Sequence, residues 1–254
     1  MSGDTQAFAG LVRLHQQLIQ RPGAGETCAA WREYCSQHPC PQWVPTFDRQ
    51  PLVNSSTEPR HPDGSYRETD VDRLELAGAD QFHEIPQERI DAAIRIVVDT
   101  EGPVHLRILT HRLLTAAGFA RAGSRIQAVI RERRAQLAVA GAVELDGDFT
   151  GRPEQFRVPC LRDWTPLPDN LRQLDHVHDS ELMLALLHAV VEAGSLDTDT
   201  AMNNALYMLG FIRLTDNGRA RLGPPLTALL EQSMLTQNRE GLEPGVRAFQ
   251  RPTQ

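Results

Sequence analysis

Residues 89–143 read RIDAAIRIVVDTEGPVHLRILTHRLLTAAGFARAGSRIQAVIRERRAQLAVAGAV, and residues 181–235 repeat the same apolar pattern 92 positions later without a gap. The motif GFAR (118–121) of the first copy aligns with GFIR (210–213) of the second. Apolar positions of the first copy meet apolar or small residues in the second, whereas the remaining positions differ freely. What repeats is therefore a buried core, and the chain uses one small domain twice.

Each copy is predicted to form three helices. In the first helix of the first copy, the apolar residues recur with the spacing of one buried helix face: Ile90, Ala93, Ile94, Val97 and Val98. The segment Glu-Gly-Pro at 101–103 ends this helix. A second helix is predicted over roughly 106–117, with Gly118 as its left-handed cap, and a third over 124 to about 140.

After the third helix the apolar period becomes that of a strand. Residues 142–149 alternate apolar and polar side chains around an Asp146-Gly147 turn, as a short hairpin does. Three helices and a hairpin, with a glycine-containing turn between the last two helices, are typical of a winged helix-turn-helix. The predicted fold is therefore mainly α with small β wings, an α+β class of tandem winged helix-turn-helix repeats plus a small helical N-terminal region.

The predicted domains fill the 254 residues of the chain. They are a helical N-terminal unit (1–48), a linker (49–84), winged helix 1 (85–152), a linker (153–178), a degenerate winged helix 2 (179–240) and a tail (241–254). A hydrophobic content of 41% with 23% charged residues is ordinary for a globular protein. Because the sequence has neither a long apolar run nor a signal peptide, we expect a cytoplasmic protein.

Positive charge is concentrated in the first copy, although the net charge of the chain is −7. The chain contains no lysine, and between residues 104 and 134 seven arginines meet one acid, Glu132, which gives +6. The matching window of the second copy, 196–226, balances three arginines against three aspartates. Because local charge attracts phosphate, the first copy is predicted to bind DNA or RNA. The predicted contact residues are Arg107, Arg112, Arg121, Ser124, Arg125, Arg131 and Arg134.

The third helix of the first copy can be divided into two faces at about 100° per residue. One face is apolar and is expected to point to the core: Ile126, Val129, Ile130 and Leu137. The opposite face has mostly small residues and would meet a nucleic-acid groove: Ser124, Ala128, Arg131 and Ala135. Arg133 projects at the angle of the core face, so we expect it to extend along the surface or to pair with an internal carboxylate.

The second copy is predicted to serve protein contacts. Gly223-Pro224-Pro225 lies inside its third helix and is expected to break or kink it. Its first helix is apolar over most of its circumference, which is more than one buried stripe requires. The surplus residues are predicted to be covered by the N-terminal unit, by a second protomer or by another protein: Met183, Leu184, Leu187 and Val191.

The stretch from Ile90 to Leu235 resembles the domain of unknown function 3320. The resemblance rests on EGPVH (101–105), GFARAGSRI (118–126) and DGDF (146–149), and more faintly on GFIR (210–213). That family occurs at the C-terminus of large bacterial superfamily 1 helicases, often beside a Vsr-like endonuclease domain. The resemblance implies a winged-helix module that works with DNA- or RNA-processing proteins, some of them encoded in phage-defence loci. The chain itself has no phosphate-binding GxxxxGK[ST] motif.

Two residue clusters could bind metal, and both are interpreted as structural. Cys28, Cys35, His38 and Cys40 supply the ligand types of a zinc site, but zinc motifs usually place cysteines in closer pairs. We therefore expect no metal and no cofactor. Residues 175–179, read as Asp-His-Val-His-Asp, lie at a predicted helix start, where aspartate serves as a cap.

Three functions agree with these patterns. The first is a non-catalytic nucleic-acid-binding subunit of a helicase- or nuclease-containing system, active in phage defence or DNA repair. The second is a transcriptional regulator, which would usually dimerise on a palindrome. The third is an interaction module whose two winged helices bind only protein. No catalytic triad, nucleophile motif or paired-carboxylate pattern occurs, so we expect no enzymatic activity.

Overall fold

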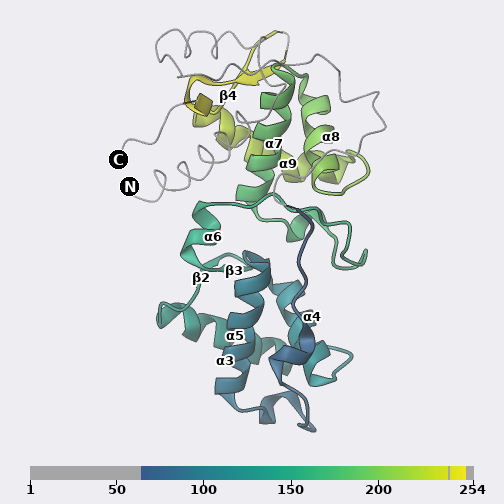
Figure 1. Ribbon diagram of the computed structural model, residues 1–254, viewed down its shortest axis with the longest axis vertical. Helices are drawn as coiled ribbons and strands as arrows, with labels where there is room; N and C mark the ends of the chain where they lie inside the picture. The colour runs from purple at the N-terminus through teal and green to yellow at the C-terminus, as the bar shows by residue number, and fades with distance from the viewer. Residues whose placement is uncertain (1–63, 240, 250–254) are drawn as a thin grey trace. The chain divides into compact units, whose positions relative to one another are not determined.

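A computed structural model of the chain describes residues 64–239 and 241–249. The described residues form two compact units (Figure 1). The first-copy unit contains residues 66–156 and 166–178, and the second-copy unit contains residues 64–65, 157–165 and the described part of 179–249. Both units are mainly helical with a few short antiparallel strands, which confirms the predicted fold class at this level.

The first-copy unit has three long helices at the predicted positions: α3 (Gln87–Glu101), α4 (Leu106–Ala117) and α5 (Ser124–Val139). Gly118 caps α4 at φ 78°, a left-handed conformation that glycine adopts without steric cost. The apolar stripe of α3 is completely buried, with Ile94 and Val97 at 0% exposure. Helix periodicity identified these elements because each helix buries one continuous face.

A three-stranded antiparallel sheet completes the first-copy unit. Strand β2 (Glu144–Asp146) and strand β3 (Phe149–Gly151) form the predicted hairpin, with Gly147 at φ 55° in its two-residue turn. The strand order is β1-β3-β2, because β1 (Val104–His105) pairs with β3 on its other side. Strand β1 was not predicted, since two residues are too few to show a strand period.

The second-copy unit repeats the helices of the first. Helices α7 (Asp179–Ala193), α8 (Thr198–Met208) and α9 (Asp216–Glu231) each begin 92 positions after their counterparts. They are followed by an antiparallel hairpin of β4 (Leu235–Gln237) and β5 (Leu242–Pro244). The repeat that was read from apolar residues alone is therefore also a repeat of helix boundaries.

The hairpin of the second copy extends further than predicted. Leu196 forms an isolated antiparallel bridge with Leu242 of β5, with N–O distances of 2.6 and 3.0 Å. Its counterpart in the first copy, Val104, pairs with β3 in the same way. The residues predicted as a tail from position 241 therefore include β5 and a 3-10 helix, η4 (Val246–Phe249). The two short strands of this hairpin are further apart in the sequence than β2 and β3, so their alternation of apolar and polar residues was not recognised.

The third helix of the second copy was predicted to break or kink, and the predicted break is wrong. Helix α9 continues through Pro224 and Pro225 to Glu231. Each proline removes one helical hydrogen bond, but Ala220, whose carbonyl loses its partner at Pro224, is exposed and can bind water. Pro225 is buried on the same helix as Leu222 and Leu229, and this packing offsets the missing bonds.

Much of the predicted 49–84 linker is structured. Residues 64–84 contain two 3-10 helices, η1 (Val71–Leu74) and η2 (Phe82–Glu84), and their apolar side chains are buried in the first-copy unit. Leu76 and Phe82 are at most 1% exposed. The segment shows neither a helix nor a strand period, because each of these apolar side chains enters the core separately and polar residues lie between them.

The predicted 153–178 linker is structured as well. It contains a short helix, α6 (Pro153–Arg157), and a 3-10 helix, η3 (Leu174–His176). Trp164 is fully buried in the second-copy unit, and its backbone N–H donates to the Leu209 carbonyl at 3.1 Å. Leu171 is 2% exposed in the first-copy unit. Segments rich in proline and aspartate were mistaken for linkers because the few apolar residues among them are far apart.

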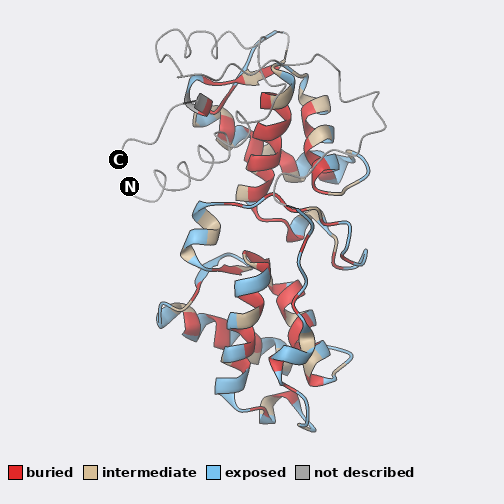
Figure 2. Cartoon of the chain, viewed as in Figure 1, coloured by how far each residue is buried: buried red, intermediate tan, exposed pale blue. Residues whose placement is uncertain are grey.

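Helix α7 is buried along nearly its whole length (Figure 2). It contacts α8, α9 and β5 within the second-copy unit. Leu184, Leu187 and Val191 are all buried, and Met183 is half-buried. These side chains therefore do not form an open surface, and their cover by the N-terminal unit, a second protomer or another protein stays a prediction. No helix in residues 64–239 or 241–249 has the length and apolar character needed to span a bilayer.

Candidate nucleic-acid interface

Four of the predicted arginines are exposed on the first-copy unit. Arg107 lies in the first turn of α4, Arg121 in the turn between α4 and α5, and Arg125 and Arg131 on α5. None of the four guanidinium groups forms an ion pair with a residue that the structure describes. Ser124, at the start of α5, is exposed as well. We call these five residues the arginine face.

The exposed side of α5 is otherwise composed of small residues. Ala128 and Ala135 are exposed beside Arg131, as the helical angles predicted. On the opposite side, Ile130 and Leu137 are buried, and Ile126 and Val129 are half-buried. A helix with small exposed residues lets its backbone approach another surface closely.

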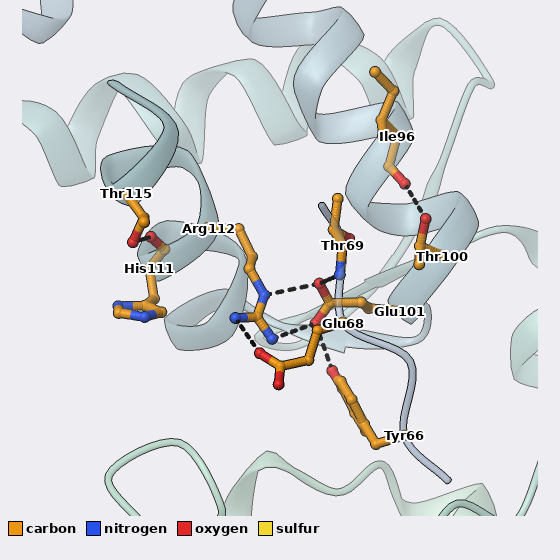
Figure 3. A network of polar contacts seen from close by, with 9 residues as sticks. All are labelled: Tyr66, Glu68, Thr69, Ile96, Thr100, Glu101, His111, Arg112 and Thr115. Carbon is orange, nitrogen blue, oxygen red and sulfur yellow. Dashed lines mark hydrogen bonds and ion pairs between the residues drawn. The ribbon is translucent and has the colours of Figure 1, made fainter. Parts of the chain in front are cut away.

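Arg112 was predicted to contact nucleic acid, but it is a buried structural residue. Its Nε and Nη2 donate to the two carboxylate oxygens of Glu101 at 2.8 and 3.1 Å, and its Nη1 lies 2.8 Å from Glu68 (Figure 3). Glu101 also accepts from the Tyr66 hydroxyl and the Thr69 backbone N–H, each at 2.8 Å. The sequence could not place Arg112 here, because its partners Glu101 and Glu68 come from two other segments of the chain.

Arg134 was also predicted to contact nucleic acid, and it is used inside the unit instead. Its Nε donates to the Thr150 hydroxyl at 2.6 Å and its Nη2 to the Phe149 carbonyl at 3.1 Å. The side chain is 4% exposed, and burial lowers its pKa from the usual value. Arg134 therefore attaches the β2–β3 hairpin to α5 and is not available to a phosphate.

Arg133 pairs with a carboxylate, as predicted from its helical angle. Its Nε donates to Asp91 of α3 at 2.7 Å, and its Nη1 donates to Gln87 and Gln136. The hydrogen bond to Asp91 raises the pKa of Arg133. Three of the seven arginines in this stretch are thus bound to the protein, and the arginine face contains the other four.

A cavity of about 540 Å³ lies beside the arginine face, within the first-copy unit. Arg107, Arg121 and Arg131 line it, together with Asp148 of the hairpin turn. Because three guanidinium groups meet one carboxylate, the cavity favours an anion. Sequence reasoning identified these arginines but not the cavity, which also includes Asn170 from the predicted linker.

His105, which also lines the cavity, is held by aromatic neighbours. Its ring stacks on His176 with centroids 4.5 Å apart and contacts Phe149 edge-on at 5.2 Å. Burial, together with the adjacent His176, lowers the pKa of His105 to about 4. The ring is therefore neutral at pH 7. Its Nδ1 accepts from the backbone N–H of Arg107 at 3.1 Å, so the proton resides on Nε2, which is a donor.

Residues of the cluster at 175–179 form contacts within the chain. Asp179 begins α7, and Nε2 of His178 lies 3.0 Å from a carboxylate oxygen of Asp146 in the hairpin. His176 Nδ1 lies 2.7 Å from the Leu171 carbonyl. Within the described part of the chain, no group of His, Cys, Asp and Glu side chains is arranged to bind a metal ion. The candidate zinc residues 28–40 lie outside the described residues.

The second-copy unit has little free positive charge at the matching positions. Arg221 forms an ion pair with Asp179 at 2.5 Å, and Arg219 pairs with Asp199. Arg213 is exposed. Arginines are thus paired in both copies, and in the matching windows four exposed arginines of the first copy but one of the second, Arg213, form no ion pair with a described residue.

Residues 80–128 match the family model described as "Protein of unknown function (DUF3320)". This match confirms the resemblance for the segment that contains α3, α4, and the start of α5. It includes Arg107, Arg121 and Arg125 of the arginine face. No curated protein and no solved structure matches the chain.

Proposed function

We propose that this protein binds nucleic acid through the arginine face of its first-copy unit. The observation that carries the proposal is that four exposed arginines have no ion-pair partner among the described residues, while the other three of the stretch are bound internally. Unpaired guanidinium groups are the side chains best suited to phosphate, which they contact with charge-assisted hydrogen bonds.

The order of elements supports the same proposal. Helix, strand, two helices and a hairpin follow one another in the order expected for a winged helix-turn-helix, in which the last helix enters the major groove. In this chain that helix is α5, and its exposed side has Ser124, Ala128 and Arg131. Arg121 and Arg125 lie at its N-terminal end, the part that usually reaches bases or phosphates.

We further propose a non-catalytic role beside a separate helicase or nuclease in the cytoplasm. This context is what the resemblance to the family of unknown function implies, and residues 80–128 match the model of that family. The second-copy unit would then serve as a scaffold, since its matching arginines are paired. Transcriptional regulation and protein-only binding remain the alternatives, and no feature of the described residues favours either.

The proposal is tested by reversing the charge of the arginine face. A triple variant with Arg121→Glu, Arg125→Glu and Arg131→Glu should lose binding to labelled DNA and RNA in anisotropy titrations at low salt. The wild-type dissociation constant should lie near the non-specific range of about 10⁻⁶–10⁻⁴ M and weaken steeply with salt. Because all three side chains are exposed, far-UV circular dichroism should not change.

A matched control distinguishes the effect of the arginine face from the effect of the total charge of the protein. Arg67→Glu, Arg73→Glu and Arg95→Glu change three exposed arginines of the same unit by the same total charge. This control should retain most of the affinity. Equal loss in both triple variants, or no binding of any nucleic acid to the wild type, would refute the proposal.

A further inference from the structure

The cavity beside the arginine face has the size of a site for one small molecule. Its volume of about 540 Å³ lies within the ~300–1,000 Å³ typical of such sites. Its walls come from α4, the α4–α5 turn, α5, the β2–β3 turn and the segment around Asn170. A paired duplex cannot enter a space of this size, whereas a single nucleotide can.

One part of the lining suits a phosphate group. Arg107, Arg121 and Arg131 come from three different elements and all line the cavity. None is neutralised by an ion pair with a described residue, and Asp148 is the one acid in the lining. The Nε2–H of neutral His105 adds an uncharged donor. Converging guanidinium groups bind phosphate oxygens more strongly than single cations do.

Another part of the lining suits a nucleobase. Leu106, Leu114 and Leu171 provide apolar surface, and Thr110, Gln127 and Asn170 provide hydroxyl and amide groups. Bases have this combination of an apolar face and a hydrogen-bonding edge, and proteins recognise unpaired bases through both. A simple inorganic anion would leave the apolar part of the cavity unused.

We propose that this cavity binds one nucleoside monophosphate, either free or as the unpaired terminal nucleotide of a strand. The phosphate would contact the three arginines, and the base would lie against the leucines. The strand-terminal form rests on the proposed nucleic-acid binding, whereas the free form does not. The cavity would thus add an end-recognition or nucleotide-sensing site beside the proposed nucleic-acid-binding face.

The first experiment measures binding of free ligands to the full chain by isothermal titration calorimetry at low salt. Deoxyadenosine 5′-monophosphate should bind saturably. Deoxyadenosine and inorganic phosphate should each bind at least about tenfold more weakly, because each lacks half of the contacts. If no nucleoside monophosphate binds, or if phosphate alone binds equally well, the proposal is wrong.

The second experiment fills the cavity without changing charge. Ala122 is half-buried and lines it, and Asn170 is exposed on another wall, so Ala122→Trp and Asn170→Trp obstruct the same space from two elements. Each variant should weaken the binding of the monophosphate at least about tenfold. The affinity for a blunt duplex should change by less than about threefold, because the arginines remain. Ala92→Trp, at an exposed position of α3 outside the lining, should change neither.

The outcomes separate this proposal from the proposed function. Duplex binding without any effect of either cavity variant on the monophosphate would refute the cavity site and leave the arginine face intact. Monophosphate binding without binding of any nucleic acid would refute the proposed function and support the free-nucleotide form. Stronger competition by a duplex with a 5′-phosphorylated overhang than by a blunt duplex would support the strand-terminal form.

Discussion

At the scale of single residues, the arginines of the first copy differ in what surrounds them. The side chains of Arg112 and Glu101 form an ion pair and are 6% and 0% exposed. The Glu101 carboxylate also accepts hydrogen bonds from Tyr66 and Thr69. Arg121 and Arg125 are exposed on the same unit. Burial and partners therefore decide whether an arginine stabilises the fold or remains available to a ligand.

Replacing Glu101 should test how far the fold depends on this network. Glu101→Gln removes the charge that balances the buried Arg112, and loss of one partner of a buried pair typically costs about 3–5 kcal/mol. Glu68→Gln removes a partner that is 40% exposed and should cost at most about 1 kcal/mol. Urea unfolding followed by circular dichroism measures both free energies, and equal losses would contradict a central role for Glu101.

At the scale of elements, α9 shows how packing overrides local preference. Two consecutive prolines would end an isolated helix, yet α9 continues beyond them because Leu222, Pro225 and Leu229 are buried together. The two prolines are not equivalent: Pro224 is exposed, whereas Pro225 is part of the buried side. Pro224 therefore destabilises the helix by removing a hydrogen bond, and its exposed side chain does not offset this loss by packing in the core.

Pro224→Ala should stabilise the protein. The alanine restores an N–H donor to the Ala220 carbonyl and removes a steric clash, a change worth up to about 3 kcal/mol in a helix interior, reduced by the greater freedom of the unfolded chain. We expect a gain of about 1–2 kcal/mol in thermal unfolding. Pro225→Ala should gain less, since it also loses buried surface. A larger gain at position 225 than at 224 would contradict this explanation.

At the scale of the whole molecule, stability depends on pH through the sum of all groups whose pKa changes on folding. In the first-copy unit, burial lowers the pKa of His105 to about 4, and burial also lowers those of His111 and His176. The unfolded chain takes up protons near pH 6.5, while folded His105 stays neutral until about pH 4. The free energy of unfolding should therefore fall as the pH drops from 7 to 4.

His105→Asn should reduce this pH dependence. Asparagine is a favourable N-cap and can accept from the Arg107 backbone N–H as His105 does, so α4 should keep its start. Melting temperatures measured between pH 7 and pH 4 should decline less in the variant than in the wild type. An identical decline in both proteins would show that His105 does not contribute in this range.

The sequence by itself determined the repeat, the helix boundaries and the separation of charge. These features follow from local periods: one buried face per helix, a glycine at the end of α4, and an Asp-Gly turn in the hairpin. The pairing of Arg133 also followed from a local angle, because position on a helix decides which side chains point inward.

The tertiary structure alone decided which arginines are free and where the cavity lies. Arg112 and Arg134 have the same local sequence character as Arg107 and Arg131, and they differ through partners such as Glu68 and Thr150 from other segments. The cavity likewise requires residues around Asn170, distant in sequence from α4 and α5. Such contacts produce no periodic pattern in the sequence, because the burial of a single side chain depends on which distant residues pack against it in the folded protein.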